Sequence, residues 1–169
     1  YKMALSMTPD DVAAIAAQLY VEMLEAGFSR VGEFHYLHHD KDGSPFANIA
    51  EMGERIAAAS AAAGIGLTLL PVFYAHSQFG GQVPGEGQRR FINDVSSFAR
   101  LLEGAQKAVQ TLNQPKVGIA PHSLRAATIE EIRELQQLDF DGPVHIHIAE
   151  QVKEVADSIA FSGRRPVEY

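Results

Sequence analysis

The chain has 169 residues, the length of one ordinary domain, and 46% of them are hydrophobic and 21% charged, as in typical globular proteins. Its 14 basic against 21 acidic residues give a formal charge of −7, which argues against general binding of nucleic acids or anionic membranes. Because there is no cysteine, disulfides, thiol catalysis and cysteine-ligated zinc are excluded and a reducing cytoplasm is favoured, and no apolar run approaches the roughly 20 residues of a membrane helix.

The first half of the chain alternates predicted helices and strands. Thr8 and Asp11 have the pattern of a capping box, and Gly27 suits the end of the helix that follows. The apolar run before Tyr74 is typical of a strand buried on both faces, although Pro71 within it cannot donate a ladder hydrogen bond. The elements expected here are helices over 8–27 and from Ser44 to Gly64, and strands over 31–36 and 66–74.

The second half continues this alternation. The expected elements are a helix over 93–112, a strand over 117–120, a helix capped by Thr128 and Glu131, a strand over 144–148 and a helix over 150–160. Helices that separate strands predict parallel pairing with right-handed crossovers. Polar residues that follow the strands should therefore meet at the sheet edge where α/β folds carry their sites. These residues are His38, His76, His122 and Glu150.

Two architectures fit this order of elements. One is a small doubly wound sheet of four strands, and the other is about half of a TIM (β/α)8 barrel, a fold of roughly 250 residues. The chain opens on Tyr1 and stops on Tyr169 within the pattern, which favours the half barrel. We therefore predict an α/β fold in which residues 1–169 form one partial catalytic barrel domain, an internal fragment of a longer protein.

The segment 144–150 has the densest set of chemically active side chains. His145 and His147 share one face of the predicted strand, and Glu150 follows three residues after His147. An imidazole nitrogen can ligate zinc, and a carboxylate beside it can move protons. The alternative is that both histidines are hydrogen-bonded core residues and that Glu150 caps the next helix. Zinc needs three or four protein ligands, so the spacing alone leaves both interpretations open.

His122 and Arg125 follow another predicted strand. The planar fork of an arginine suits a carboxylate, and a neighbouring histidine can donate beside it, which indicates an anionic small substrate. The alternative for Arg125 is a solvated charge ahead of a helix.

Two further segments contain candidate residues. Strand alternation puts Glu33 on one face and Phe34 and Tyr36 on the other, without showing which face meets a site. The pair His38 and His39, followed by Asp40 and other charged residues, is interpreted as a solvated loop, with a metal-binding pair as the alternative. The loop 79–91 lacks the Lys-Ser/Thr ending of a P-loop and the glycine spacing of a dinucleotide fingerprint. It is either a lid over a site or a mobile surface loop.

Five segments together carry a resemblance to a known family. They are 33–39, 79–82 with 88–91, 120–126, 145–151 and 163–168. They resemble the amidohydrolase superfamily and, within it, the N-formimidoyl-L-glutamate deiminases of histidine degradation. The step from His147 to Glu150 is shared by many deaminases of the superfamily, whereas the other four segments point to this family. The resemblance covers nearly the whole chain.

The resemblance implies a (β/α)8 barrel with one catalytic zinc, of which this chain supplies strands two to five. It implies hydrolysis of the formimino C–N bond of N-formimidoyl-L-glutamate, which gives N-formyl-L-glutamate and ammonia. His147 matches the zinc ligand on the fifth barrel strand, and Glu150 matches the catalytic acid and base. Tyr36, His122 and Arg125 match positions that hold the substrate, with Arg125 suited to a carboxylate.

The implied partner is a small dicarboxylate, so a second cationic contact is expected from Arg89 or Arg90. Only one of the expected zinc ligands occurs in the sequence. The others are expected before Tyr1 and after Tyr169. The complete enzyme is expected to be a cytoplasmic homodimer. The chain alone should bind zinc weakly and should not turn over substrate. Two alternatives stay open: a superfamily deaminase that acts on a purine-like or pyrimidine-like ring, and a non-catalytic fragment.

Overall fold

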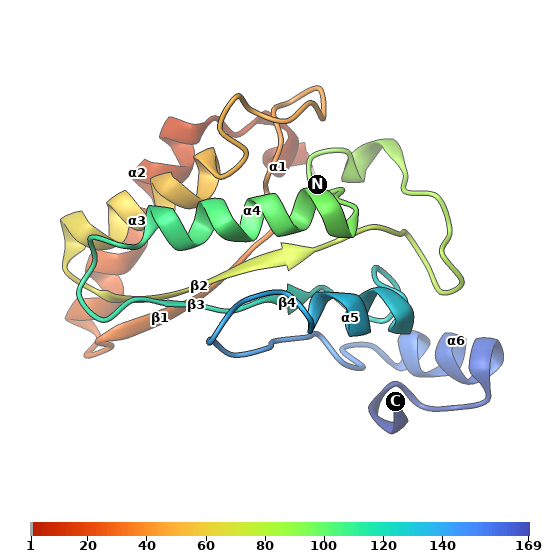
Figure 1. Ribbon diagram of the computed structural model, residues 1–169. Coiled ribbons are helices and arrows are strands. Elements are labelled where there is room, and N and C mark those ends of the chain that lie inside the picture. The colour runs from red at the N-terminus through yellow and green to blue at the C-terminus, as the bar shows by residue number, and fades with distance from the viewer. Residues whose placement is uncertain (1) are drawn as a thin grey trace.

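Parallel strands alternate with helices in the computed structural model, which describes residues 2–169 (Figure 1). The helices are α1 (Lys2–Ser6), α2 (Pro9–Glu25), α3 (Glu51–Ala63), α4 (Val95–Ala108), α5 (Ile129–Leu135) and α6 (Val152–Ser162), with 3-10 turns η1 (Glu86–Gln88) and η2 (Pro166–Glu168). The strands are β1 (Arg30–His35), β2 (Gly66–Phe73), β3 (Lys116–Val117) and β4 (Ala120–Pro121). Within this described part, no helix is both long and apolar enough to cross a membrane.

The central strand β2 pairs in parallel on both of its edges. β1 runs along one edge, from Arg30 opposite Gly66 to His35 opposite Pro71. On the other edge β3 pairs as far as Leu69, and β4 resumes the pairing at Val72. Pro71 thus lies where the second ladder is interrupted, so its missing N–H removes no regular bond there.

The predicted strand over 117–120 is wrong in its continuity, because two short strands replace it. Gly118 and Ile119 separate them. The chain at Pro143 passes directly against Gly118, where a Cβ would lie 2.0 Å from the Pro143 carbonyl oxygen. Ile119 N–H donates to the same carbonyl over 3.1 Å. The close approach requires a residue without a side chain.

The predicted strand over 144–148 is also wrong as a regular strand, although the segment follows the sheet edge. It forms one isolated parallel bridge, between Val144 and Ile119, and two further hydrogen bonds: His145 N–H donates to Ile119 O and His147 N–H to His122 O. No residue in the described range pairs with its outer edge, and Val144 and Ile148 are 46% and 43% exposed.

Helix ends follow local capping chemistry where the sequence supplies it. The capping boxes of Thr8 with Asp11 and of Thr128 with Glu131 are both formed. Asp94 caps α4, so the predicted start at 93 is nearly right. The predicted start of α3 at Ser44 is wrong, because the Asp42 carboxylate accepts hydrogen bonds from Ser44 and holds it in a loop.

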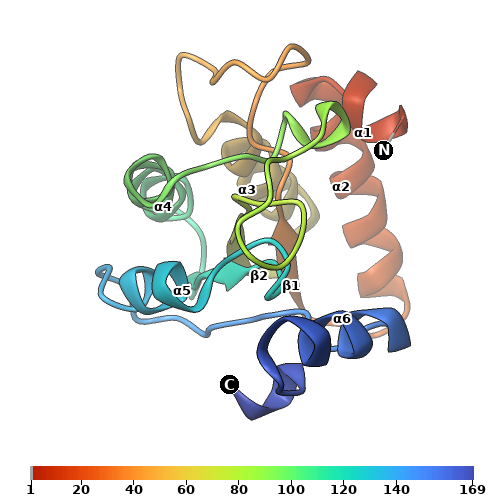
Figure 2. The same ribbon diagram turned by 90° about the vertical axis from the view of Figure 1, so that its right-hand side faces the viewer.

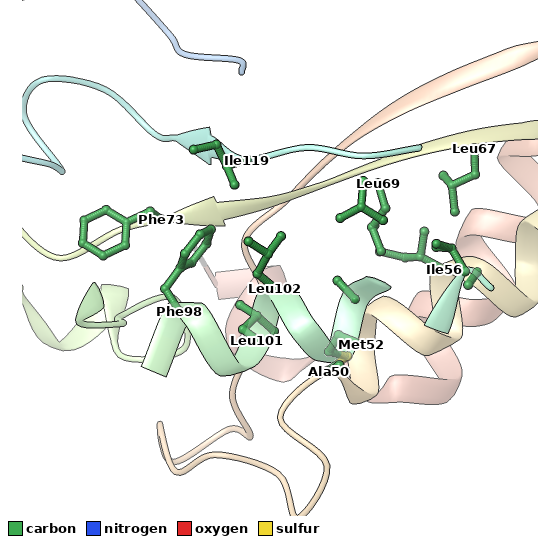
Figure 3. Close-up of a cluster of buried hydrophobic side chains, with 14 of the residues drawn as sticks. Ala50, Met52, Ile56, Leu67, Leu69, Phe73, Phe98, Leu101, Leu102 and Ile119 are labelled. Carbon is green, nitrogen blue, oxygen red and sulfur yellow. The ribbon is translucent and has the colours of Figure 1, made fainter. Parts of the chain in front are cut away.

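The core lies between the sheet and helices α2, α3 and α4 (Figure 3). Its side chains are almost entirely apolar, so burial of hydrocarbon surface is the main stabilising contribution. The labelled members are Ala50, Met52, Ile56, Leu67, Leu69, Phe73, Phe98, Leu101, Leu102 and Ile119.

Helices α2, α3, α4 and α5 follow one another in an arc around the strands when the molecule is viewed along the sheet (Figure 2). A doubly wound sheet would have helices on both faces, so the arrangement is that of a partial (β/α) barrel. Helix α6 lies beyond the carboxyl ends of the strands (Figure 1). The inner face of the sheet carries a separate small cluster of Leu70, Val72 and Ala120, packed against Phe34 and Tyr36.

Candidate active site

Aromatic and imidazole rings meet on the inner face, near the carboxyl ends of the strands. His122, directly after β4, lies at their centre: its ring centroid is 5.7 Å from Tyr36, 4.6 Å from Tyr74 and 5.0 Å from His147. Phe34 closes the group, 4.3 Å from the His147 ring. The structure therefore brings together Tyr36, His122 and His147, three of the residues that the sequence singled out.

The strand register also shows which face of 33–36 meets the site. Phe34 and Tyr36 point to the inner cluster. Glu33 points the other way, where its carboxylate accepts a hydrogen bond from the Tyr20 hydroxyl on α2 over 2.7 Å. Burial raises the pKa of the Glu33 carboxyl.

His122 is held by the strand end and kept neutral by its surroundings. Its backbone N–H donates to Phe73 O, and its Nδ1 lies 3.1 Å from the Ser123 hydroxyl. Burial, with repulsion from His147 and Arg125, lowers the pKa of His122 to about 4. At neutral pH the ring can thus donate from one nitrogen and accept at the other.

His147 is the candidate metal ligand, and one of its ring nitrogens is free. Its Nδ1 atom is buried and has no hydrogen-bond partner among residues 2–169. An unpartnered imidazole nitrogen fits a ligand position. Nevertheless, the described residues contain no group of three or more His, Cys, Asp or Glu side chains placed to hold a metal ion. The described residues therefore do not form a complete metal site by themselves.

Glu150 follows a strained turn. Ala149 has a φ of 62°, in the left-handed region that a residue with a Cβ adopts at a cost of about 1 kcal/mol or more. This residue turns the chain from the extended segment toward α6 and leaves Glu150 exposed. Strain of this kind concentrates at functional positions.

A pocket of about 290 Å³ joins Glu150 to two of the predicted substrate-binding residues, His122 and Arg125, whereas Tyr36 is not among its lining residues. Its lining residues are Tyr74, Gln78, His122, Arg125, Glu150, Gln151, Lys153, Glu154 and Asp157. Arg125 is partly buried, and its Nε lies 3.6 Å from Oε1 of Glu154 on α6. Sequence reasoning missed Glu154, because several helices of this chain have an acidic residue in the first turn and nothing in the sequence distinguishes this one.

The structure does not bring the remaining candidates, Arg89 and Arg90, to this pocket. The Arg89 side chain donates to the carbonyl oxygens of Lys41 and Glu86. Arg90 is completely buried and donates to three carbonyl oxygens, those of His39, Ala4 and Met7. Arg90 thus connects the N-terminal segment to the loop after β1.

The interpretation of 38–39 as a solvated loop is wrong. His38 is fully buried with Nε2 2.9 Å from Val72 O, and His39 Nε2 lies 2.7 Å from Ile92 O. Burial lowers the pKa of both rings, so they are neutral core residues. His145, by contrast, is exposed. The glycine-rich loop packs on α6, where Phe79 stacks with Phe161 at 6.0 Å.

The fold is that of a partial (β/α) barrel, and the chain belongs to the Amidohydrolase family, whose model matches residues 2–169. It is 49% identical to the formimidoylglutamate deiminase of Pseudomonas aeruginosa over 170 residues, which cover all of this chain and 37% of that protein.

Solved structures show the same fold. An amidohydrolase from Brucella melitensis matches with a TM-score of 0.97 and 64% identity, over 99% of this chain and 38% of that one. Atrazine chlorohydrolase from Arthrobacter aurescens, solved with zinc, matches in fold with a TM-score of 0.74 at 16% identity, over 96% of this chain and 35% of that one. The chain thus spans little more than a third of the length of these relatives.

Proposed function

We propose that the full natural chain carrying these residues hydrolyses the formimino C–N bond of N-formimidoyl-L-glutamate, which gives N-formyl-L-glutamate and ammonia. The observation that carries the proposal is the pocket in which Glu150, His122 and Arg125 meet beside His147. The 49% identity to a formimidoylglutamate deiminase supports the choice of substrate.

We propose zinc as the cofactor, with His147 as the one ligand that this chain supplies. The free, buried Nδ1 of His147 fits that role. The other ligands would come from the part of the enzyme that corresponds to the rest of its relatives. When bound, zinc supplies a Lewis acid that makes water nucleophilic at neutral pH.

Glu150 moves the protons in this proposal. As a carboxylate it takes a proton from the attacking water, while the water oxygen forms a bond to the formimino carbon. It then delivers that proton to the terminal nitrogen, and the second proton of the former water follows as the water oxygen becomes the formyl carbonyl oxygen. The bond from carbon to the terminal nitrogen breaks, and this nitrogen leaves as ammonia. Glu150 lines the same pocket as His122 and Arg125, which supports this role.

Arg125, His122 and Tyr36 hold the substrate in this proposal. The guanidinium of Arg125 binds a substrate carboxylate through paired N–H donors. The neutral His122 ring donates to or accepts from the substrate without adding charge, since its pKa is about 4. Tyr36 packs beside His122 and closes the inner wall.

The test is ammonia release by the zinc-loaded full natural chain, with N-formimidoyl-L-glutamate and guanine as competing substrates. Release from the formimino compound alone supports the proposal. Release only from guanine would replace the substrate and keep the roles of His147 and Glu150. No release from either would indicate a non-catalytic protein.

A further inference from the structure

We propose that Glu154 is a positioning residue for Arg125: it holds the Nε edge of the guanidinium so that the remaining N–H groups are free for a substrate carboxylate. This inference rests on the proposed function and extends it to a residue on α6, outside the set of groups that touch the substrate.

Glu154 is a buried carboxylate without hydrogen bonds. Its exposed fraction is 3%, and neither side-chain oxygen has a hydrogen-bond partner among residues 2–169. A buried charge is costly unless another charge compensates it. The compensating charge is Arg125, with Nε 3.6 Å from Oε1 of Glu154. The N-terminal turn of α6, in which Glu154 lies, adds a favourable helix dipole.

Arg125 is held by this ion pair, but its N–H donors are not used in hydrogen bonds with the described residues. At 3.6 Å the contact is an ion pair and not a hydrogen bond. Within the described part of the chain, the guanidinium makes no hydrogen bond, so the four N–H groups on its two terminal nitrogens stay available. A side chain that is 25% exposed and lines the pocket can present these donors to a ligand.

The other charges of the pocket do not compete for this role. Lys153, the other cation in the lining, donates to Asp157 over 2.6 Å. Glu150 is the exposed carboxylate that the mechanism uses. A carboxylate ligand therefore meets one cation that no hydrogen bond occupies, and Glu154 fixes where that cation lies. A cation that contacts the carboxylate equally in the bound substrate and in the transition state contributes uniform binding, so a change in its position should raise KM more than it lowers kcat.

The first test compares kinetic constants of the zinc-loaded full natural chain with N-formimidoyl-L-glutamate. Glu154→Gln keeps the shape and removes the charge; we expect KM to rise about tenfold, with kcat within about threefold of the unaltered enzyme. Glu154→Asp, which keeps the charge on a shorter side chain, should give an intermediate KM. The matched control is Asp141→Asn, since Asp141 forms an exposed ion pair of 3.7 Å with Lys116; both constants should stay unchanged.

A second readout separates this inference from the proposed function. Calorimetry with glutarate measures carboxylate binding without turnover, and Glu154→Gln should weaken it about tenfold. If the unaltered enzyme does not turn over the formimino compound, the proposed function fails and calorimetry alone decides the role of Glu154. Three results would each overturn the positioning role of Glu154. They are an unchanged KM and glutarate affinity in Glu154→Gln, no glutarate binding by the unaltered protein, and a loss of kcat at constant KM. If Glu154→Gln does not fold, Glu154→Asp provides the same comparison.

Discussion

Gly118 is expected to control the position of the segment that carries His147 and Glu150. An alanine Cβ there would lie 2.0 Å from the Pro143 carbonyl oxygen and 3.0 Å from Leu70 Cδ2. Because ordinary contacts begin near 3.4 Å, the Pro143 backbone must move by more than 1 Å. The move breaks the bonds of Ile119 N–H with Pro143 O and of His145 N–H with Ile119 O.

The expected magnitude follows from these contacts. Two lost backbone hydrogen bonds cost about 1 kcal/mol each, and overpacking adds about 1–3 kcal/mol, so Gly118→Ala should lower the free energy of unfolding by about 3–5 kcal/mol. A displacement of about 1 Å at the site should also reduce kcat/KM by roughly 10²-fold.

The assay is urea unfolding followed by circular dichroism, together with ammonia release. Gly32→Ala is the matched control, because Gly32 lies in β1 with an ordinary φ, and its nearest obstacle, Leu70 Cδ1, is 3.9 Å away. That variant should be neutral or slightly stabilising. If Gly118→Ala unfolded within about 0.5 kcal/mol of Gly32→Ala and kept full activity, the reasoning about this close approach would be refuted.

Three further predictions concern the site and the buried histidines. Glu150→Gln should cut kcat by roughly 10² or more while zinc content, measured by metal analysis, is unchanged; full activity would contradict its assigned role. Arg125→Ala should raise KM for the substrate about tenfold or more without loss of zinc, and a loss of zinc at constant KM would argue against carboxylate binding. Burial lowers the pKa of His35 to about 4, from its ordinary value of 6.5. As the pH falls below 6.5, His35 therefore gains a proton in the unfolded chain but stays neutral in the folded chain. The free energy of unfolding should drop by about 2 kcal/mol between pH 7 and pH 5. Urea unfolding at both pH values checks this, with His35→Gln showing a smaller drop; equal drops would contradict it.

Local sequence patterns predicted most helices and strands, whereas the burial of individual side chains depends on contacts between residues far apart in the sequence. The capping boxes at Thr8 and Thr128 and the apolar run of β2 depend on neighbours in sequence, so they could be predicted. The burial of His38 depends on the carbonyl of Val72, which is 34 residues away. Its sequence neighbours, Asp40 and the following charged residues, indicated solvent instead.

The candidate site shows the same division. His122 and Arg125 follow a strand, and this placement alone brought them to one pocket with Glu150. The role of Glu154 depends on the packing of α6 beyond the strand ends, which no spacing in the sequence encodes. The interruption near Gly118 likewise arises from a chain segment about 25 residues later.

The most direct test of the proposed reaction is product analysis by ¹H NMR after incubation of N-formimidoyl-L-glutamate with the zinc-loaded full natural chain. Attack on the formimino carbon with loss of the terminal nitrogen predicts N-formyl-L-glutamate and ammonia in equal amounts. Glutamate and formamide in place of these products would show that the other C–N bond breaks, and would contradict the roles assigned to Glu150 and Arg125.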